Sequence, residues 1–199
     1  MYGFHAIYGN DMRLDSNTYL ATDYVALRRY LGEVRFNLLT AECSAAQALN
    51  MHDSSSRLPE QIARLAHAPP ELCEIAILER ALRDAFEAVE PIACGHTKER
   101  VTLHASVHLL KFSQNTVSIW SSLKCGETPP RPYRLETPQC VLVWRHDSQS
   151  RMRLLGEDEF TSLAAIRNGA DKLDPDYLRG WLDTGLLIDA AKTGAACVV

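Results

Sequence analysis

The chain has 199 residues, of which 46% are hydrophobic, and a formal net charge of −4. This length and apolar content indicate an ordinary globular protein with one generous domain or two small ones. The negative charge argues against binding a polyanion through bulk electrostatics, because nonspecific affinity for nucleic acid comes from clustered Lys and Arg. A nucleic-acid function would therefore need a local basic patch.

Neither the N-terminal sequence nor the cysteine pattern indicates export. Residues 1–8 lack the basic start, apolar centre and cleavage site of a secretory signal, and no apolar run is long enough to cross a bilayer. The cysteines are scattered, without a C-x-x-C pair or the spacing of a zinc site. They are Cys43, Cys73, Cys94, Cys125, Cys140 and Cys197. We expect a cytoplasmic protein without a membrane segment, whose thiols are buried and reduced.

The first half of the chain has the three- and four-residue apolar spacing of amphipathic helices. Apolar residues from Leu20 to Leu38 predict one helix, bent at Gly32. The polar stretch 51–57 has no periodicity and is rich in turn-favouring residues, which predicts a loop. A short helix is expected to start at Leu58, with Pro59 in its first turn.

The clearest helix begins near Pro70 and has one continuous apolar stripe. The stripe consists of Leu72, Ile75, Leu78, Leu82, Phe86 and Val89. On its polar side, Glu79 and Arg83 stand four residues apart, as a weakly stabilising surface pair would. The stretch 92–100 then breaks the helical period, which places a boundary between two halves near residue 100.

The second half predicts three strands followed by two short helices. Ser106–Phe112, Cys140–Trp144 and Arg151–Leu155 have the apolar, β-branched and aromatic content of strands, and the last two form a hairpin. Between the first two strands, residues 115–123 could form a short helix or an irregular crossover, and the Pro-rich stretch 125–133 predicts an extended loop.

Both C-terminal helices have recognisable ends. The acidic residues 157–159 suit the N-terminus of the first helix. Asp174 and Pro175 form an N-cap and first-turn pair for the second, and Gly185 is placed to end it. The tail after Asp189 is expected to be poorly ordered.

Catalytic or metal-binding signatures are sparse. His104 and His108 have the same parity on an extended segment, so both imidazoles could point to one side, but no third ligand is apparent nearby. The chain has no Gly-rich phosphate loop, H-E-x-x-H or G-x-S-x-G motif. We therefore predict a non-catalytic protein with no metal site and no cofactor of its own.

The predicted hairpin is basic, and three interpretations of it stay open. Arg145, His146, Arg151 and Arg153 concentrate positive charge there, with Arg131 and Arg134 shortly before it. The charges could protect an exposed strand edge from unwanted pairing. They could contact a protein or peptide, or they could bind DNA as the hairpin of a winged-helix regulator does.

Four stretches resemble a known family: Ala76–Phe86, Leu103–Phe112, Val141–Asp147 and Tyr177–Leu187. They are similar to the MbnC-like partner subunits that accompany TIM-barrel, iron-dependent enzymes acting on ribosomally made peptides, as in methanobactin biosynthesis. In that family the partner forms a heterodimer with the barrel enzyme, of the MbnB-like type, which holds the iron. The enzyme uses dioxygen to oxidise precursor cysteines to oxazolone and thioamide groups. Related partners have often been labelled DNA-binding, which is the alternative function here.

The resemblance implies an α+β fold and a role in presenting the precursor's leader peptide. Residues 1–100 would form an N-terminal helical domain, and 101–199 a winged-helix-like domain with a three-stranded antiparallel sheet and helices. By architectural analogy with leader-recognition modules, the leader would add to the third strand beside the third helix. The implied peptide-binding residues are Arg151, Met152, Arg153, Leu154 and Leu155 on the strand, and Tyr177, Leu178 and Trp181 along the groove.

Overall fold

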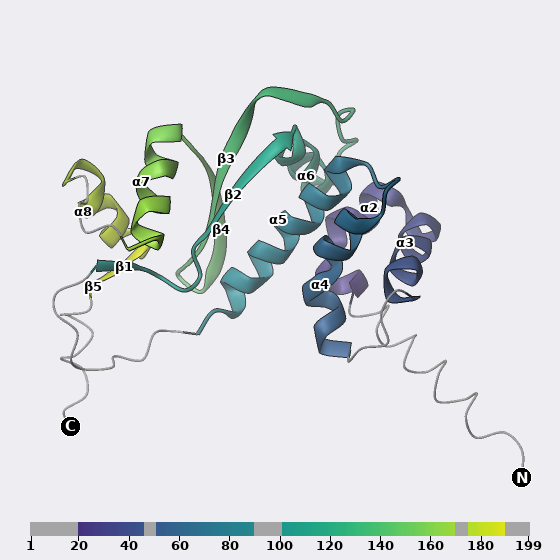
Figure 1. Cartoon of the computed structure of the whole chain (residues 1–199), viewed down its shortest axis with the longest axis horizontal. Helices are drawn as coiled ribbons and strands as arrows, with labels where there is room; N and C mark the ends of the chain where they lie inside the picture. Colours follow the sequence, from purple (N-terminus) through teal and green to yellow (C-terminus); the bar gives the residue numbers. More distant parts are fainter. Residues whose placement is uncertain (1–19, 46–50, 90–100, 170–174, 190–199) are drawn as a thin grey trace, which may run out of the picture. The chain divides into compact units, whose positions relative to one another are not determined.

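The computed structural model describes residues 20–45, 51–89, 101–169 and 175–189 (Figure 1). It combines helices with a three-stranded antiparallel sheet, which confirms the α+β class. The chain divides into two compact units, Met1–Arg80 with Ser113–Glu136 and Ala81–Phe112 with Thr137–Val199. This division differs from the expected halves 1–100 and 101–199, since 113–136 belong with the helices of the first unit. The expected boundary at 92–100 and the tail after Asp189 lie outside the described residues.

The first unit is built from helices around one apolar cluster. They are α2 (Val25–Leu31), α3 (Glu33–Ala45), α4 (Met51–Arg64), the first part of α5 (Pro70–Glu87) and α6 (Thr116–Cys125). Gly32 separates α2 from α3 with a φ of 75°, which confirms the predicted bend. Residues 115–123, for which a short helix and an irregular crossover were both possible, mostly belong to helix α6. In α6, Ile119 and Leu123 are buried in the same cluster as Tyr24 and Phe36.

The predicted loop at 51–57 is wrong, because these residues form the first half of α4. Pro59 therefore stands inside a helix and not in its first turn. Leu58 and Ile62, one turn apart, are completely buried in the cluster of the first unit. Tertiary burial of this kind overrides the turn preference of a polar stretch, because helix propensity is only a weak local bias.

Helix α5 confirms the predicted stripe over its first turns and departs from it at its end. Leu72, Ile75 and Leu78 are buried, but Phe86 is 59% exposed. Val89 lies beyond the last helical residue, Glu87, and is 76% exposed. The stripe stays buried only where α5 has other elements packed against it.

Two carboxylates of α5 form hydrogen bonds at the starts of other helices in the first unit. Glu79 accepts hydrogen bonds from the backbone N–H groups of Ala26 (2.7 Å) and Leu27 (3.0 Å) at the start of α2. Glu74 accepts bonds from the backbone and hydroxyl groups of residues 113–116 ahead of and within the first turn of α6. The N–H groups of Ala26 and Leu27 are in the first turn of α2 and have no partners inside their own helix, so the Glu79 carboxylate satisfies them. Glu79 was predicted to face the surface, and the structure buries it instead.

The second unit contains the sheet, in the order β2 (His108–Gln114), β3 (Arg134–His146), β4 (Gln149–Leu155). The register of β3 and β4 runs from His146↔Gln149 to Cys140↔Leu155, so the predicted hairpin is confirmed. Its turn consists of Asp147 and Ser148, with φ values of 50° and 59°. Two positive values identify a type I′ turn, whose twist matches that of the flanking strands.

Helices α7 (Glu157–Arg167) and α8 (Pro175–Asp183) cover one face of this sheet. The apolar cluster between the sheet and these helices contains Leu142 and Trp144 from β3, Leu163 and Ile166 from α7, and Trp181 from α8. Both helices were predicted, as was the end of α8 near Gly185, whose φ is 70°.

A second, two-stranded sheet was not predicted. It pairs β1 (Val101–Leu103) antiparallel with β5 (Leu187–Asp189). Three residues per strand are too few to show a period of two, and the partners lie at opposite ends of the second half of the sequence.

The expectation of buried thiols holds for part of the chain. Cys43 and Cys140 are buried free thiols, and Cys73 is half-buried. Cys125 is exposed, because it stands in the last turn of α6 just before Gly126. Cys94 and Cys197 lie outside the described residues. Among the described helices, none has the length and apolar content to span a membrane.

Candidate functional site

Strand β4 is the outer strand of the sheet and carries five of the predicted site residues. Among the described strands it pairs with β3 alone, so one of its edges faces away from the sheet. Arg151 and Leu154 are exposed, and Met152, Arg153 and Leu155 are half-buried. The structure thus confirms that these residues lie on an edge strand.

The register fixes which backbone groups of β4 point outward. A β-turn closes with a hydrogen bond between its first and fourth residues, so His146 and Gln149 form a hydrogen-bonded pair. Bonded and non-bonded pairs then alternate along an antiparallel ladder. Arg151 and Arg153 therefore direct their N–H and C=O groups toward β3. Ser150, Met152 and Leu154 direct theirs away from the sheet, where a further strand could bind.

The two faces of β4 have different surroundings. Arg151 and Arg153 are opposite Trp144 and Leu142, and so lie on the face covered by α7 and α8. Ser150, Met152 and Leu154 lie on the other face. There the last turns of α5 come close, since the Ser150 hydroxyl donates to the Leu82 carbonyl at 2.5 Å.

A bridge of three side chains joins β4 to α8 through α7. The Arg153 guanidinium donates two hydrogen bonds to the Glu159 carboxylate, at 2.9 and 2.5 Å. The Trp181 indole N–H donates to the same carboxylate at 2.9 Å. The hydrogen bonding that Glu159 accepts from Arg153 is the main reason that the pKa of Glu159 is lowered, and the same interaction raises the pKa of Arg153. Two predicted site residues are thus brought together by a third that was not predicted.

The helix part of the predicted site belongs mostly to the core. Trp181 is only 3% exposed, and its ring stacks on that of Tyr177 at a centroid distance of 5.1 Å. Tyr177 and Leu178 are half-buried and pack against the same cluster. Of the residues assigned to the groove wall, Tyr177 and Leu178 are therefore partly accessible to a ligand. Trp181 is buried and donates its indole N–H to the Glu159 carboxylate.

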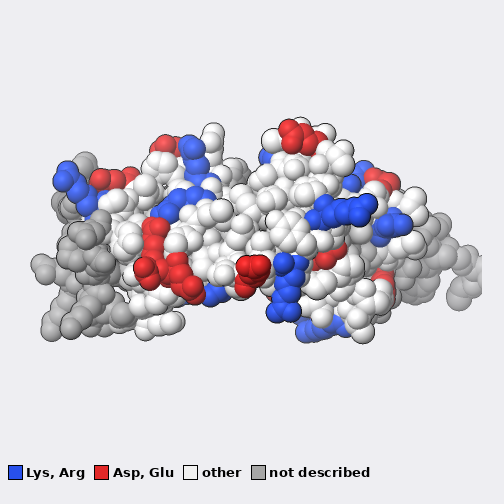
Figure 2. All heavy atoms as spheres, turned by 90° about the horizontal axis from the view of Figure 1, so that it is seen from above, with Lys and Arg blue, Asp and Glu red and all other residues white. Residues whose placement is uncertain are grey.

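Most basic side chains of the hairpin form contacts inside the second unit. Arg153 is paired with Glu159, His146 lies 3.3 Å from Asp147, and an Arg145 guanidinium nitrogen donates to the Phe86 carbonyl at 3.4 Å. Arg151 is exposed and has no acidic partner among the described residues. Figure 2 shows Lys and Arg in small groups interspersed with Asp and Glu on the face in view. Arg131 and Arg134 are exposed and belong to the first unit.

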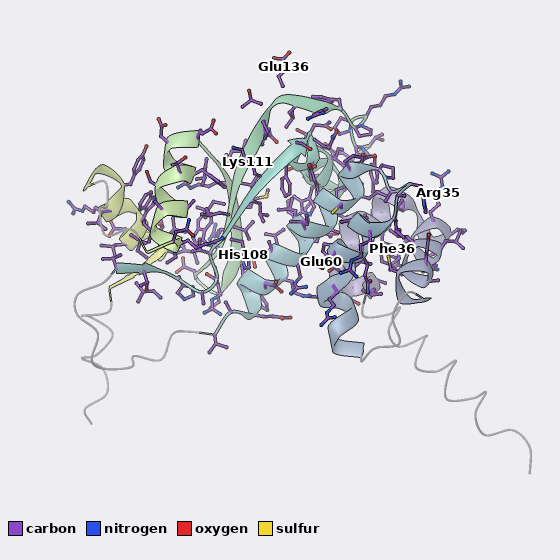
Figure 3. The ribbon with its side chains drawn as sticks, in the orientation of Figure 1. Arg35, Phe36, Glu60, His108, Lys111 and Glu136 are labelled. Carbon is purple, nitrogen blue, oxygen red and sulfur yellow. The ribbon has the colours of Figure 1, made fainter. Side chains whose placement is uncertain are left out.

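The other edge strand, β2, also has a basic side chain that contacts α7. Figure 3 labels His108 and Lys111 on β2. The Lys111 ammonium lies 3.1 Å from the Glu157 carboxylate and 5.9 Å from the centre of the Phe160 ring. These contacts attach β2 to the first turn of α7.

His104 and His108 do not form the shared face that their parity suggested. The backbone turns between them, and the Val107 N–H donates to the His104 carbonyl at 3.0 Å. The imidazole Nδ1 of His104 instead lies 2.7 Å from the Ser106 hydroxyl. Within the described ranges, no group of three or more His, Cys, Asp or Glu side chains could hold a metal ion. The parity argument failed because it assumed one continuous strand from residue 104.

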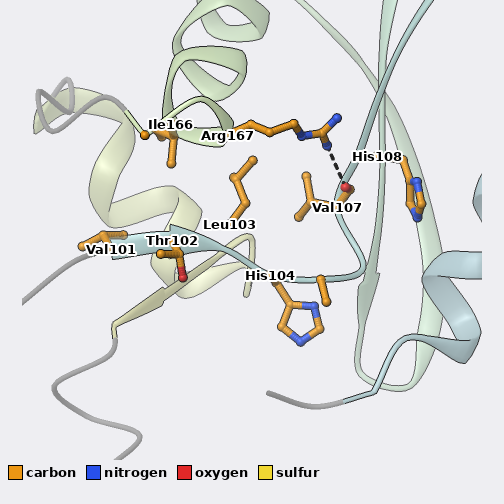
Figure 4. Close-up of a pocket in the computed structure, with 10 residues that line it drawn as sticks. Val101, Thr102, Leu103, His104, Val107, His108, Ile166 and Arg167 are labelled. Atoms are coloured by element: carbon orange, nitrogen blue, oxygen red, sulfur yellow. Dashed lines mark hydrogen bonds between the residues drawn. The ribbon is translucent and has the colours of Figure 1, made fainter. Parts of the chain in front are cut away.

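A cavity of about 510 Å³ lies beside this turn (Figure 4). Its wall is mixed, with aliphatic side chains beside the Arg167 guanidinium, which donates to the Val107 carbonyl at 2.8 Å. Burial lowers the pKa of Arg167. The lining residues include Val101, Leu103, His104, Val107, Ile166 and Arg167.

Neither the models of known protein families nor the curated proteins match this chain. What the chain binds is therefore inferred from its own geometry. That geometry combines outward N–H and C=O groups on β4, two apolar side chains beside them and one exposed arginine.

Proposed function

We propose that this chain is a non-catalytic subunit that binds the leader of a ribosomally made precursor peptide as an added strand on β4. The outward backbone groups of Ser150, Met152 and Leu154 carry this proposal, because they are the donors and acceptors that an extended peptide needs. Main-chain hydrogen bonds would supply affinity, and the side chains along the edge would supply selection.

In this proposal the chain acts in the cytoplasm as one half of a heterodimer with a TIM-barrel iron enzyme. The partner holds the iron and oxidises precursor cysteines to oxazolone and thioamide groups, while this chain contributes no cofactor. The support is the resemblance of Leu103–Phe112, Val141–Asp147 and Tyr177–Leu187, which in the structure include parts of β2, β3 and α8.

The alternative, a DNA-binding regulator, has less support. Duplex binding depends on cationic side chains that reach the phosphates. The Arg153 guanidinium is already occupied by the Glu159 carboxylate, and the net charge of the chain is −4. An edge that binds through its backbone does not require those charges.

The test compares Leu154→Pro with Leu154→Ala. Proline removes the outward N–H and is tolerated at an edge position whose N–H is not in the ladder, so the sheet should remain folded. Alanine removes the side chain and keeps the N–H. We expect the proline variant to lose about tenfold or more in affinity, and the alanine variant to lose much less. Fluorescence anisotropy with the labelled leader of a cysteine-containing precursor encoded beside the gene measures both.

Circular dichroism must show that both variants keep their fold. If the folded proline variant binds the leader as the unaltered chain does, β4 is not the binding edge, and the edge of β2 becomes the next candidate. Submicromolar binding of a labelled DNA duplex that weakens steeply with salt would favour the DNA-binding alternative instead.

A further inference from the structure

We infer that the β4 edge selects an extended segment with an acidic residue beside Arg151 and apolar residues beside Met152 and Leu154. This inference rests on the proposed function, since it assigns the chemistry of the peptide that the edge takes. Three features of β4 support this inference. Its side chains alternate between two faces, one face carries an apolar row, and only one of its two arginines is paired with a described carboxylate.

The alternation of the strand determines which side chains meet. Residues directly opposite each other on neighbouring strands point to the same face, with Cβ atoms about 5 Å apart. A peptide residue beside Met152 or Leu154 therefore lies on the face toward the end of α5. A peptide residue beside Arg151 or Arg153 lies on the face toward α7. An added strand thus meets two different surfaces with its odd and even positions.

The first surface is an apolar row that ends at the open edge. Met152 is opposite Val143 and Leu154 is opposite Val141, and both valines are completely buried. Leu154 is 51% exposed, although its neighbour across the ladder is fully covered. Apolar peptide side chains at these two positions would extend the row and cover Leu154, and burial of that surface favours binding.

The second surface contains two arginines in different states. The Arg153 guanidinium is neutralised by the Glu159 carboxylate, which also accepts the Trp181 indole N–H. Arg151 is exposed and has no carboxylate partner in the described part of the chain. A peptide residue beside Arg153 therefore meets a paired charge, whereas one beside Arg151 meets a cation that no described carboxylate neutralises. Opposite charges directly across two strands attract, and like charges repel.

Together these surfaces define a sequence pattern for the ligand. For an antiparallel strand, read from its N-terminus, the order is apolar, any residue, apolar, acidic. For a parallel strand the order is reversed to acidic, apolar, any residue, apolar. The spacing is fixed by β4, because Arg151, Met152 and Leu154 set the three selective positions.

An amide-detected NMR titration of the full chain tests this pattern with short synthetic peptides. One peptide carries the antiparallel order and a second carries the reversed order. A third and a fourth are made from whichever of these two orders binds: the third replaces its acidic residue with lysine, and the fourth replaces both of its apolar residues with serine. We expect one of the first two to shift the amide signals of Ser150, Met152 and Leu154, and the lysine and serine versions to bind about threefold or more weakly.

The charge assignment is tested by Arg151→Glu. This variant should reverse the preference, so that the lysine peptide binds more tightly than the acidic one. Arg131→Glu is the matched control, since Arg131 is also exposed but belongs to the other unit. It should leave the preference unchanged.

The outcomes separate this inference from the proposed function. If all the peptides shift the β4 amides equally, the edge binds peptides without this selection, and the inference is wrong while the proposed function stands. If no peptide, and no leader, shifts those amides, both are wrong. A preference that survives Arg151→Glu unchanged would show that another group reads the acidic residue, which also overturns the inference.

Discussion

Glu79 is the residue whose environment differs most from what its sequence position suggests. Its carboxylate is buried beneath the start of α2, where it accepts two backbone hydrogen bonds. Burial raises its pKa from 4.5 to about 7, although the N–H groups of Ala26 and Leu27 and the charge of Lys124 act in the opposite direction. The charge of Asp23 adds to the increase. The cap therefore ionises within the physiological range.

Because of this shift, the Glu79 carboxyl should make the free energy of unfolding depend on pH. Because the pKa is higher in the folded state, folding takes up a proton between about pH 4.5 and 7. The stabilisation is present below that window and is lost as pH rises through the folded pKa, on the order of 3 kcal/mol for a shift of this size. Glu79→Gln should remove this component. Urea unfolding at about pH 5 and about pH 8 measures it.

The comparison of the unaltered chain with Glu79→Gln separates this effect from that of the other carboxyl groups, which both proteins share. An unchanged pH dependence in the variant would show that Glu79 stays ionised in the folded state. In that case its two backbone hydrogen bonds would outweigh the cost of burying its charge.

At the scale of elements, Gly32 decides that one predicted helix becomes two. It ends α2 with φ 75° and ψ 160°, and its N–H donates to the Arg28 carbonyl. This combination of angles is accessible almost exclusively to glycine. The chain can therefore change direction there without a loop.

Two glycine-to-alanine substitutions should have opposite effects on stability. Gly32→Ala imposes a strained backbone and should cost about 1–3 kcal/mol. Gly180 lies inside α8, has no positive φ and has open space where a Cβ would be placed. Gly180→Ala should therefore stabilise by about 0.5–1 kcal/mol. Thermal unfolding of both variants measures the signs, and a neutral Gly32→Ala would show that the chain relaxes at this junction.

At the scale of the whole molecule, the two units each leave apolar side chains uncovered. In the first unit, Val34 and Leu38 lie one turn apart on α3 and are 73% and 66% exposed. In the second, Phe86 and Leu154 are exposed. Neighbouring exposed apolar side chains such as Val34 and Leu38 often mark a protein interface.

If the proposed heterodimer is right, the chain should copurify in equal amounts with a TIM-barrel iron enzyme when both are expressed together. Size-exclusion chromatography at micromolar concentration should show one shared peak, because an obligate partner covers a large apolar area. The iron content of the complex should survive replacement of His104 and His108 by alanine, since the turn between these residues separates them. Two independent peaks would contradict the heterodimer, and loss of iron would place ligands in this chain.

The sequence alone determined the features that repeat within a few residues. The stripe of Leu72, Ile75 and Leu78, the hairpin of β3 and β4 and the glycine at the end of α8 all follow from local periodicity and backbone preference. The strand Arg151–Leu155, which carries five of the predicted site residues, was predicted in the same way. Each of these signals lies within a short stretch of chain, so a single sequence is sufficient to detect it.

The meeting of distant segments follows from the tertiary structure and not from local patterns. The tertiary structure turned 51–57 into a helix by burying Leu58 and Ile62, and it paired β1 with β5 across most of the second unit. It also placed Glu159 between Arg153 and Trp181. Local patterns cannot reveal such contacts, because their free energy depends on which surfaces the rest of the chain brings together and removes from water.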